Sequence, residues 1–388
     1  MSTLKCNAFR NTASNDGGID IDASGHVTVD GQQLPTTGAL SSRRLNINGA
    51  MQIAQRSTSV TSITSAGYYT VDRWRTDLSS LGTYTQTQEA DAPAGFKHSL
   101  KMDCTTADAS PAAGDYFYLR YSFEGQDLQH LAYGTSSAVP MTISFYVKSN
   151  KTGNATLNIQ QRDNSDRQLA LQYTISTAAT WEKKTLAIPG DTSGLLNDDS
   201  GSALEFQFWL NSGSNYTGGS HQTTWAAEDN TDRNASNLGI GGSTDDYFQI
   251  TGVQIEQGEA ATSFEHRSFG DELARCERYF EFISTEGNTR GVLGPGYCES
   301  GSTAAGYILY KTKKRAAPTI TRSSTVGDFN FLNTGSSAAL SALTFDAITT
   351  NGGRFSATSS ASGFNDGGGG FLTALNANTC TISIDAEL

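Results

Sequence analysis

The chain has 388 residues, enough for two or three domains, and only 17% of them are charged. Its formal net charge of −12, with no basic stripe, argues against a nucleic-acid-binding protein and against adhesion to anionic membranes by charge alone. Five scattered cysteines without a C-x-x-C pair argue against a disulfide framework or a structural zinc site. Many Gly, Ser, Thr, Asn and Ala residues favour short strands and an all-β architecture.

Residues 1–45 show three short strand patterns, over residues 4–9, 18–22 and 27–31. So short a segment, with so few apolar residues, buries too little surface to close a core within one chain. We therefore expect it to fold against copies of itself or against another protein. The run from Asp20 to Gly25 looks like the start of an EF-hand loop, but Gly31 stands where the last glutamate ligand belongs, so a plain turn is the stronger interpretation.

Residues 46–270 contain five runs in which apolar and polar residues alternate. These runs cover residues 116–123, 141–148, 155–162, 168–175 and 204–210. Alternation places one side of each strand inward and the other outward. The inward sides make a core suited to a two-sheet sandwich. The residues expected in this core are Ile143, Phe145, Val147, Leu157, Ile159, Leu204, Phe206, Phe208 and Leu210.

The outward sides of two runs carry amides, an arginine and a tryptophan. An exposed Trp209 would offer a platform for the C–H face of a sugar, and planar amides would bind its hydroxyl groups. We therefore expect a glycan site on this face and the loop after it. The site residues expected are Gln160, Arg162, Gln207, Trp209, Asn211, Tyr216 and Trp225. The alternative is that Trp209 covers an apolar patch under a loop and that the amides are ordinary sheet surface.

A strand pattern over residues 248–256, with a slip at Gly252 that indicates a bulge, ends this part of the chain. From Asp271 the apolar spacing changes to three and four residues, and acidic residues in the first turn oppose the helix dipole. A short amphipathic helix is therefore expected there. Further strand patterns up to residue 388 predict a second, smaller antiparallel sandwich, and the basic cluster at 311–315 is expected to be a solvated edge.

Several segments resemble parts of tail-fibre and other virion appendage proteins of tailed bacteriophages. They are "STLKCNAFRNTAS", "LNINGAMQIAQRST", "YYTVDRWR", "ITGVQIEQGEAATSFEHRS", "ELARCERYFE" and "KKRAAPTIT". The order and length of the strands also resemble the jelly-roll sandwich of carbohydrate-binding modules. The resemblance implies a virion component, a homotrimer, an N-terminal segment that attaches to other tail proteins, and a core position for Trp74.

Motifs of nucleophilic or zinc-dependent enzymes are missing from the sequence, its five histidines are dispersed, and no repeat of the kind found in spike depolymerases is present. We expect no enzyme activity, no cofactor and no metal. There is no apolar N-terminal run typical of a signal peptide and no long apolar stretch, so we expect a soluble chain, assembled in the host cytoplasm.

The resulting hypothesis is a trimeric tail fibre that binds a host-surface glycan. Its parts would be an attachment and trimerisation segment (1–45), a jelly-roll domain (46–270) and a helix followed by a distal sandwich (271–388). One alternative is a purely architectural virion decoration or capsid fibre that binds no receptor. Another is a bacterial adhesin or an accessory module of a glycan hydrolase.

Overall fold

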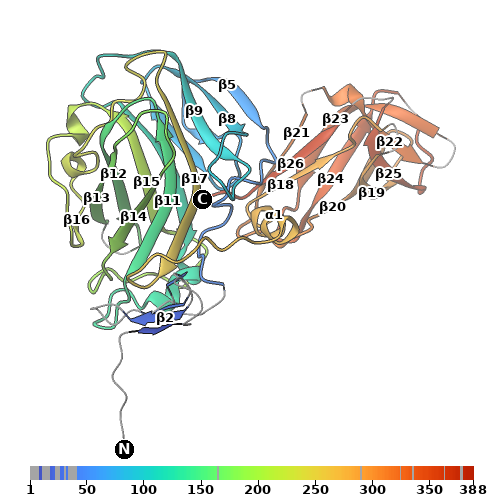
Figure 1. Ribbon diagram of the computed structural model, residues 1–388. Coiled ribbons are helices and arrows are strands. Elements are labelled where there is room, and N and C mark those ends of the chain that lie inside the picture. Colours follow the sequence, from blue (N-terminus) through green and yellow to red (C-terminus); the bar gives the residue numbers. More distant parts are fainter. Residues whose placement is uncertain are drawn as a thin grey trace, which may run out of the picture. The chain divides into compact units, whose positions relative to one another are not determined.

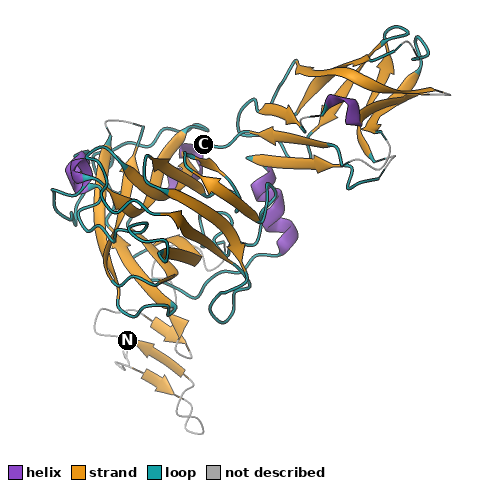
Figure 2. Cartoon of the chain, turned by 90° about the horizontal axis from the view of Figure 1, so that it is seen from above, coloured by secondary structure: helices purple, strands orange, loops and turns teal. Residues whose placement is uncertain are grey.

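A computed structural model describes residues 8–10, 18–21, 27–29, 32–33, 42–163, 166–288, 291–323, 325–333, 336–361, 363–375 and 379–388. The chain forms two compact units, Met1–Phe269 and Gly270–Leu388 (Figure 1). Antiparallel strands dominate both units, and the helices are short (Figure 2). The expected all-β class with a short helix is confirmed. Within the described ranges, no helix is long and apolar enough to cross a membrane.

The first unit contains a sandwich of two sheets. The seven-stranded front sheet has the order β16 (Ala226–Ala227), β13 (Arg167–Ile175), β12 (Gly153–Gln161), β15 (Ser202–Ser212), β10 (Tyr116–Glu124), β7 (Arg75–Ser79) and β6 (Gly67–Tyr68). The six-stranded back sheet has the order β14 (Glu182–Ile188), β11 (Met141–Ser149), β17 (Tyr247–Gln257), β9 (Ser99–Thr106), β8 (Thr83–Glu89) and β5 (Ser59–Ile63). Short 3-10 turns lie at Gly125–Leu131, Ser214–Tyr216 and Asn230–Asp232.

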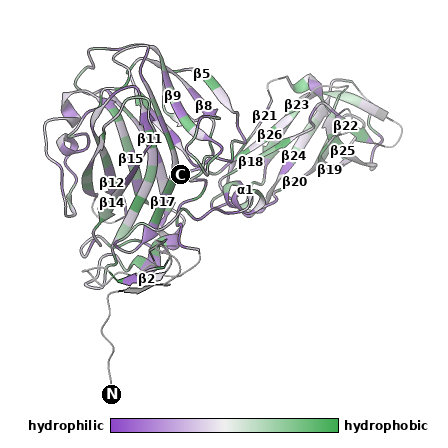
Figure 3. Ribbon diagram, viewed as in Figure 1, coloured by the Kyte–Doolittle hydropathy of each residue, from purple (hydrophilic) through white to green (hydrophobic). Residues whose placement is uncertain are grey.

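The core lies between these two sheets, and hydrophobic and hydrophilic residues both occur along its strands (Figure 3). Four of the five expected runs lie within a strand, the run over 155–162 extends one residue beyond β12, and all nine residues expected in the core are buried. The ring centroids of Phe145 on the back sheet and Phe208 on the front sheet lie 5.1 Å apart. Trp74, expected in the core, is fully buried beside Phe208 and Tyr121.

The bulge expected at Gly252 is confirmed, because the pairing of β17 with β11 changes register between Ser144 and Tyr146. Gly252 has a φ of +61°, which favours glycine. Next to it, Val253 donates its N–H to the carbonyl of Gly49 at 2.9 Å. A Cβ on Gly49 would lie 2.0 Å from the Val253 oxygen, so the chain can approach β17 only with glycine there.

The segment before the sandwich runs along β17. Asn46 donates to the Val253 carbonyl at 2.8 Å and accepts from the Ile255 N–H at 2.9 Å. Glu265, which follows β17, accepts backbone N–H bonds from Ser42 (2.6 Å) and Arg44 (2.8 Å). Both ends of the sandwich are therefore joined by hydrogen bonds, and the two that Asn46 makes are buried.

The described N-terminal residues form a small antiparallel sheet of β1 (Ala8–Arg10), β2 (Gly18–Ile21), β3 (Val27–Val29) and β4 (Gln32–Gln33). Residues 4–7 of the first expected strand and residues 22–25 of the EF-hand-like run lie outside the described residues. Completion of this segment by sister subunits stays a prediction.

In the second unit, helix α1 (Phe269–Glu277) leads into a three-stranded sheet and a closed barrel. The sheet has the order β18 (Phe280–Ser284), β26 (Thr381–Asp385) and β21 (Thr319–Arg322). The barrel has the order β19 (Val292–Cys298), β20 (Thr303–Leu309), β24 (Gly352–Ser359), β23 (Ser336–Asp346), β22 (Phe329–Asn333) and β25 (Gly369–Ala374), and a 3-10 turn covers Val326–Asp328. The second sandwich expected from the sequence is therefore a closed barrel with a small sheet, because β25 pairs with both β19 and β22.

The basic cluster at 311–315 is not simply a solvated edge. Lys314 is fully buried, its Nζ lies 2.7 Å from Oε2 of the equally buried Glu281, and it also donates to the Glu277 carbonyl. Burial, opposed by Glu281, lowers the pKa of Lys314. The expectation was wrong for this lysine because a buried carboxylate on β18 needs a cation beside it.

We predict that the Glu265 contacts make the stability of the sandwich sensitive to acid. Burial works against ionisation, but the N–H bonds from Arg44 and Ser42, together with the positive charges of Arg267 and Arg43, outweigh it and hold the pKa of Glu265 below its usual value. The carboxylate therefore stabilises the fold above its unfolded pKa, and this contribution disappears as the pH falls through the folded pKa.

The difference in urea midpoint between the parent and Glu265→Gln should accordingly shrink from about pH 6 to about pH 3. All four tryptophans lie in the first unit, so their fluorescence follows this unit alone. The exposed Glu259→Gln is the matched control. A difference between parent and Glu265→Gln that stays constant with pH would contradict the assignment.

Candidate functional site

The outer face of the front sheet carries the polar residues that alternate with the core positions of β12, β15 and β10. Asn158 of β12 pairs with Gln207 of β15, and Gln160 pairs with Glu205. On the other side of β15, Tyr118 of β10 pairs with Trp209 and Arg120 pairs with Gln207. The expected sharing of one face by these β12 and β15 residues is confirmed.

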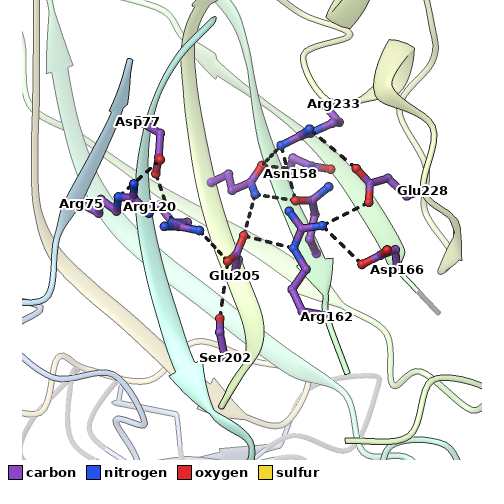
Figure 4. A network of polar contacts seen from close by, with 12 residues as sticks. Arg75, Asp77, Arg120, Asn158, Arg162, Asp166, Ser202, Glu205, Glu228 and Arg233 are labelled. Atoms are coloured by element: carbon purple, nitrogen blue, oxygen red, sulfur yellow. Dashed lines mark hydrogen bonds and ion pairs between the residues drawn. The ribbon is translucent and has the colours of Figure 1, made fainter. Parts of the chain in front are cut away.

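Eight charged side chains form a continuous network on and beside this face (Figure 4). Arg120 lies between two carboxylates, with its Nε 3.1 Å from Asp77 Oδ2 and its Nη1 2.6 Å from Glu205 Oε1. The remaining pairs are Arg75–Asp77 (3.5 Å), Arg162–Glu205 (3.4 Å), Arg162–Asp166 (3.4 Å), Arg162–Glu228 (3.2 Å) and Arg233–Glu228 (3.7 Å). Four arginines meet four carboxylates, so the formal charge of the network is zero.

The pairing keeps these groups ionised where they are poorly hydrated. Burial disfavours the charged form of Arg120, but Glu205 and Asp77 outweigh it and raise the pKa of the guanidinium. For Asp77, burial dominates and raises the pKa of the carboxyl, although Arg120 and Arg75 oppose it. Removing either partner of such a pair would leave a buried charge without compensation.

Trp209 is not the exposed platform expected from the sequence. The residue is fully buried. Its ring stacks on that of Tyr118, with 4.7 Å between the ring centroids, and its centroid lies 5.2 Å from that of Tyr216. The Arg233 guanidinium carbon lies 5.1 Å from the centroid of the Trp209 ring, a cation–π geometry. The expectation failed because the loop after β15 brings Arg233 and Tyr216 over the face.

The amides beneath this loop are also fully buried. Gln207 donates to Oε1 of Gln160 at 2.6 Å, and Arg233 donates to both side-chain oxygens at 3.4 and 3.3 Å. Gln160 Nε2, Asn158 Oδ1 and Arg233 Nε are buried without a protein partner. Each such atom costs about 1–3 kcal/mol unless water or a ligand group satisfies it. These three atoms lie beneath the loop and are not open to a ligand from solution.

The other expected site residues are distributed unequally. Arg162 remains 30% exposed at the open side of the network, and Tyr216 is half-buried. Asn211 lies beside a neighbouring pocket of about 590 Å³. That pocket is also lined by Asp108, Lys151, Ser214, Asn237 and Asp246.

Trp225 stands apart from this site. Its indole N–H donates to the Pro189 carbonyl at 2.7 Å, and its ring meets Tyr133 at 6.0 Å. It packs partly against the core next to β16, at the far edge of the front sheet. The structure thus brings together Gln160, Arg162, Gln207, Trp209 and Tyr216, places Asn211 at the margin and separates Trp225.

Sequence reasoning missed Tyr118, Arg120, Asp77, Glu228 and Arg233. Tyr118 and Arg120 could have been found, because they alternate with the buried Phe117 and Leu119 on β10. Glu228 and Arg233 lie in a loop without periodic pattern and left no such signal.

Across the part of the chain that the structure describes, no three or more His, Cys, Asp or Glu side chains gather in a way that could hold a metal ion. The carboxylates of the network contact arginines instead.

Neither a protein family nor a curated protein matches this sequence. The enzymatically active domain of tailspike protein 4 of bacteriophage CBA120 is 11% identical, with a TM-score of 0.29 over 55% of this chain and 21% of that one. A putative sugar binding protein from Bacteroides thetaiotaomicron is 13% identical, with a TM-score of 0.30 over 55% of this chain and 100% of that one. A family 11 carbohydrate-binding module from Clostridium thermocellum is 15% identical, with a TM-score of 0.26 over 53% of this chain and 100% of that one. Identities and scores this low carry no information about ligand or assembly.

We predict that Arg233 holds the loop over Trp209. Arg233→Ala should lower the unfolding free energy of the sandwich by about 1–2 kcal/mol, because a desolvated cation–π contact is lost. It should also increase acrylamide quenching of the Trp209 fluorescence. This signal is isolated by subtracting the spectrum of the same protein with Trp209→Phe.

Arg275→Ala is the matched control, since Arg275 also pairs with a carboxylate but lies on α1. Unchanged quenching in Arg233→Ala would show that other loop contacts suffice to bury Trp209.

Proposed function

We propose that the chain binds a neutral glycan at the outer face of the front sheet, through the open side of its arginine–carboxylate network. The supporting observation is the charge balance of this face in a chain of net charge −12. Four guanidinium groups and four carboxylates neutralise one another, so an ionic ligand gains little there. Their remaining donors and acceptors suit a ligand rich in hydroxyl groups.

Access to the site is through its rim. Arg75 and Arg162 are each about one-third exposed, at 31% and 30%, and Glu228 is 22% exposed. Three of the site residues are buried and position the arginines and the loop, namely Gln160, Gln207 and Trp209. The residues that would contact the ligand directly are Arg162, Arg75 and Glu228. This division revises the expected role of Trp209 from platform to support.

We further propose that the chain acts as a homotrimeric tail fibre of a tailed bacteriophage, located in the virion tail and used for adsorption to the host surface. Support comes from the sequence segments that resemble virion appendage proteins and from the N-terminal strand β2. Its Ile19 and Ile21 are 40% and 38% exposed, as expected of a segment that needs partner surface. Three equivalent sites would convert weak single-site binding into firm attachment.

Arg162→Ala should weaken glycan binding at least about tenfold, because a hydrogen bond from a charged donor is worth about 1.5–3 kcal/mol. Binding is measured by screening the full chain on a panel of host-type polysaccharides and then titrating the ligand that binds by calorimetry. Arg275→Ala, on α1, should bind as the parent does. Equal affinity of Arg162→Ala and parent would refute this face as the site, and an absence of glycan binding would favour the architectural alternative.

The full chain should sediment as a trimer, and a variant carrying Ile19→Ser and Ile21→Ser should shift toward monomer. Both side chains are exposed in the single chain, so the substitutions should leave the melting temperature of the sandwich unchanged. A full chain that is monomeric at micromolar concentration would overturn the fibre proposal while leaving glycan binding open to its own test.

A further inference from the structure

The barrel of the second unit exposes large apolar side chains on its outer wall. Tyr297 is 48% exposed, Tyr307 59%, Leu309 69% and Phe371 48%. They come from the adjacent strands β25, β19 and β20. Phe371 is opposite Pro295 on β19, and Tyr307 is opposite Arg354 on β24. These residues make one aromatic patch across the barrel wall.

The inner side of the same strands shows that folding does not require this patch. Gly296 and Gly306 face the buried ring of Phe355, and a Cβ on them would lie 3.0 and 2.4 Å from that ring. The barrel interior is filled by the buried residues of its core, among them Phe355, Leu293 and Ile308, whereas Tyr297, Tyr307 and Leu309 of the same strands remain exposed. Solvent-exposed aromatic residues that add nothing to the core point to a binding surface.

A groove of about 250 Å³ lies at the end of this patch formed by Tyr307 and Leu309. It is lined by Tyr307, Leu309, Thr349, Asn351, Gly352 and Arg354. Arg354 is fixed by two carboxylates, with Glu299 and Asp346 each 3.0 Å from its guanidinium nitrogens. The groove thus places an aromatic ring beside hydrogen-bonding groups, and its surroundings carry two negative charges against one positive charge.

We propose that this groove binds a neutral pyranose ring, as a second carbohydrate site separate from the front sheet. The Tyr307 ring would stack on the apolar face of the sugar, and Arg354 and Asn351 would bind its hydroxyl groups. The excess of carboxylates disfavours an anionic ligand. The volume suits a single sugar ring, since pockets for larger ligands measure about 300–1,000 Å³.

A protein partner fits this surface less well. The ion-paired cluster of Glu299, Arg354 and Asp346 lies beside the aromatic rings, whereas the buried centre of a protein interface is depleted of charge. The barrel is closed, so these strands offer no free edge to which a strand from another chain could be added.

The test is saturation-transfer NMR of the full chain with a panel of neutral sugars, namely glucose, galactose, mannose, N-acetylglucosamine and xylohexaose, and with sialic acid as an anionic comparison. We expect transfer to at least one neutral sugar, with affinity reduced about tenfold by Tyr307→Ala and retained by Tyr307→Phe, because the ring is needed and the hydroxyl group is not. Arg162→Ala, which removes the front-sheet site, should leave this signal in place.

The second site would be overturned by transfer unaffected by Tyr307→Ala, by transfer only to sialic acid, or by no transfer to any neutral sugar. Loss of the signal in Arg162→Ala alone would support the front-sheet site and count against this one. If Tyr307→Ala instead lowers the sedimenting mass of the chain, the patch is covered by a second copy and the proposal is wrong. Tyr307 is exposed, so the variant should melt as the parent does.

Discussion

Strict alternation along β12 and β15 is the constraint on which the sandwich and its candidate site both depend. The core positions of these two strands include Leu157, Ile159, Phe206 and Phe208. The residues that alternate with these positions along each strand must therefore face outward. Those residues include Glu205 and Gln207, and neighbouring β10 contributes Arg120 to the same face. Because the loop after β15 then excludes water from much of this face, its charges must be paired within the protein. The arginine–carboxylate network is the result.

The same network is the physical basis of the proposal that this face binds an uncharged ligand. Each guanidinium is planar and holds several donors in fixed directions, and each carboxylate offers several acceptor positions. When these charges cancel, the directional hydrogen bonds remain while the net electrostatic field is weak. A polyhydroxylated ligand gains most from such a surface, and the rim at Arg162 and Arg75 gives it access.

The closure of the sandwich joins parts of the chain that are distant in sequence. Asn46 and Glu265 bond to segments more than 200 residues away, and both belong to stretches that resemble phage appendage proteins. Gly49 and Gly252 lie at the same junction, where the close approach and the bulge require them. These two segments therefore meet in a physical contact between the start of the sandwich and its last strand.

The sequence could predict those features of the fold that depend on the regular alternation of residues along a strand. Alternation predicted the core, the residues that share the outer face and the bulge at Gly252, since each depends only on neighbouring positions in a strand. It could not predict the burial of Trp209, because that depends on Arg233 in an irregular loop. It also could not predict the burial of Lys314, because this lysine pairs with Glu281 on another element. Barrel closure was missed for the same reason, because it depends on the pairing of β25 with β22, which are distant in the sequence.

The central claim is that the outer face of the front sheet is where ligand binds. Hydrogen–deuterium exchange of the full chain, with and without a bound neutral glycan, tests it most directly. The account predicts slower exchange in β12, in β15 and in the loop that carries Arg233. Slower exchange confined to other strands, with these segments unchanged under saturating glycan, would contradict it.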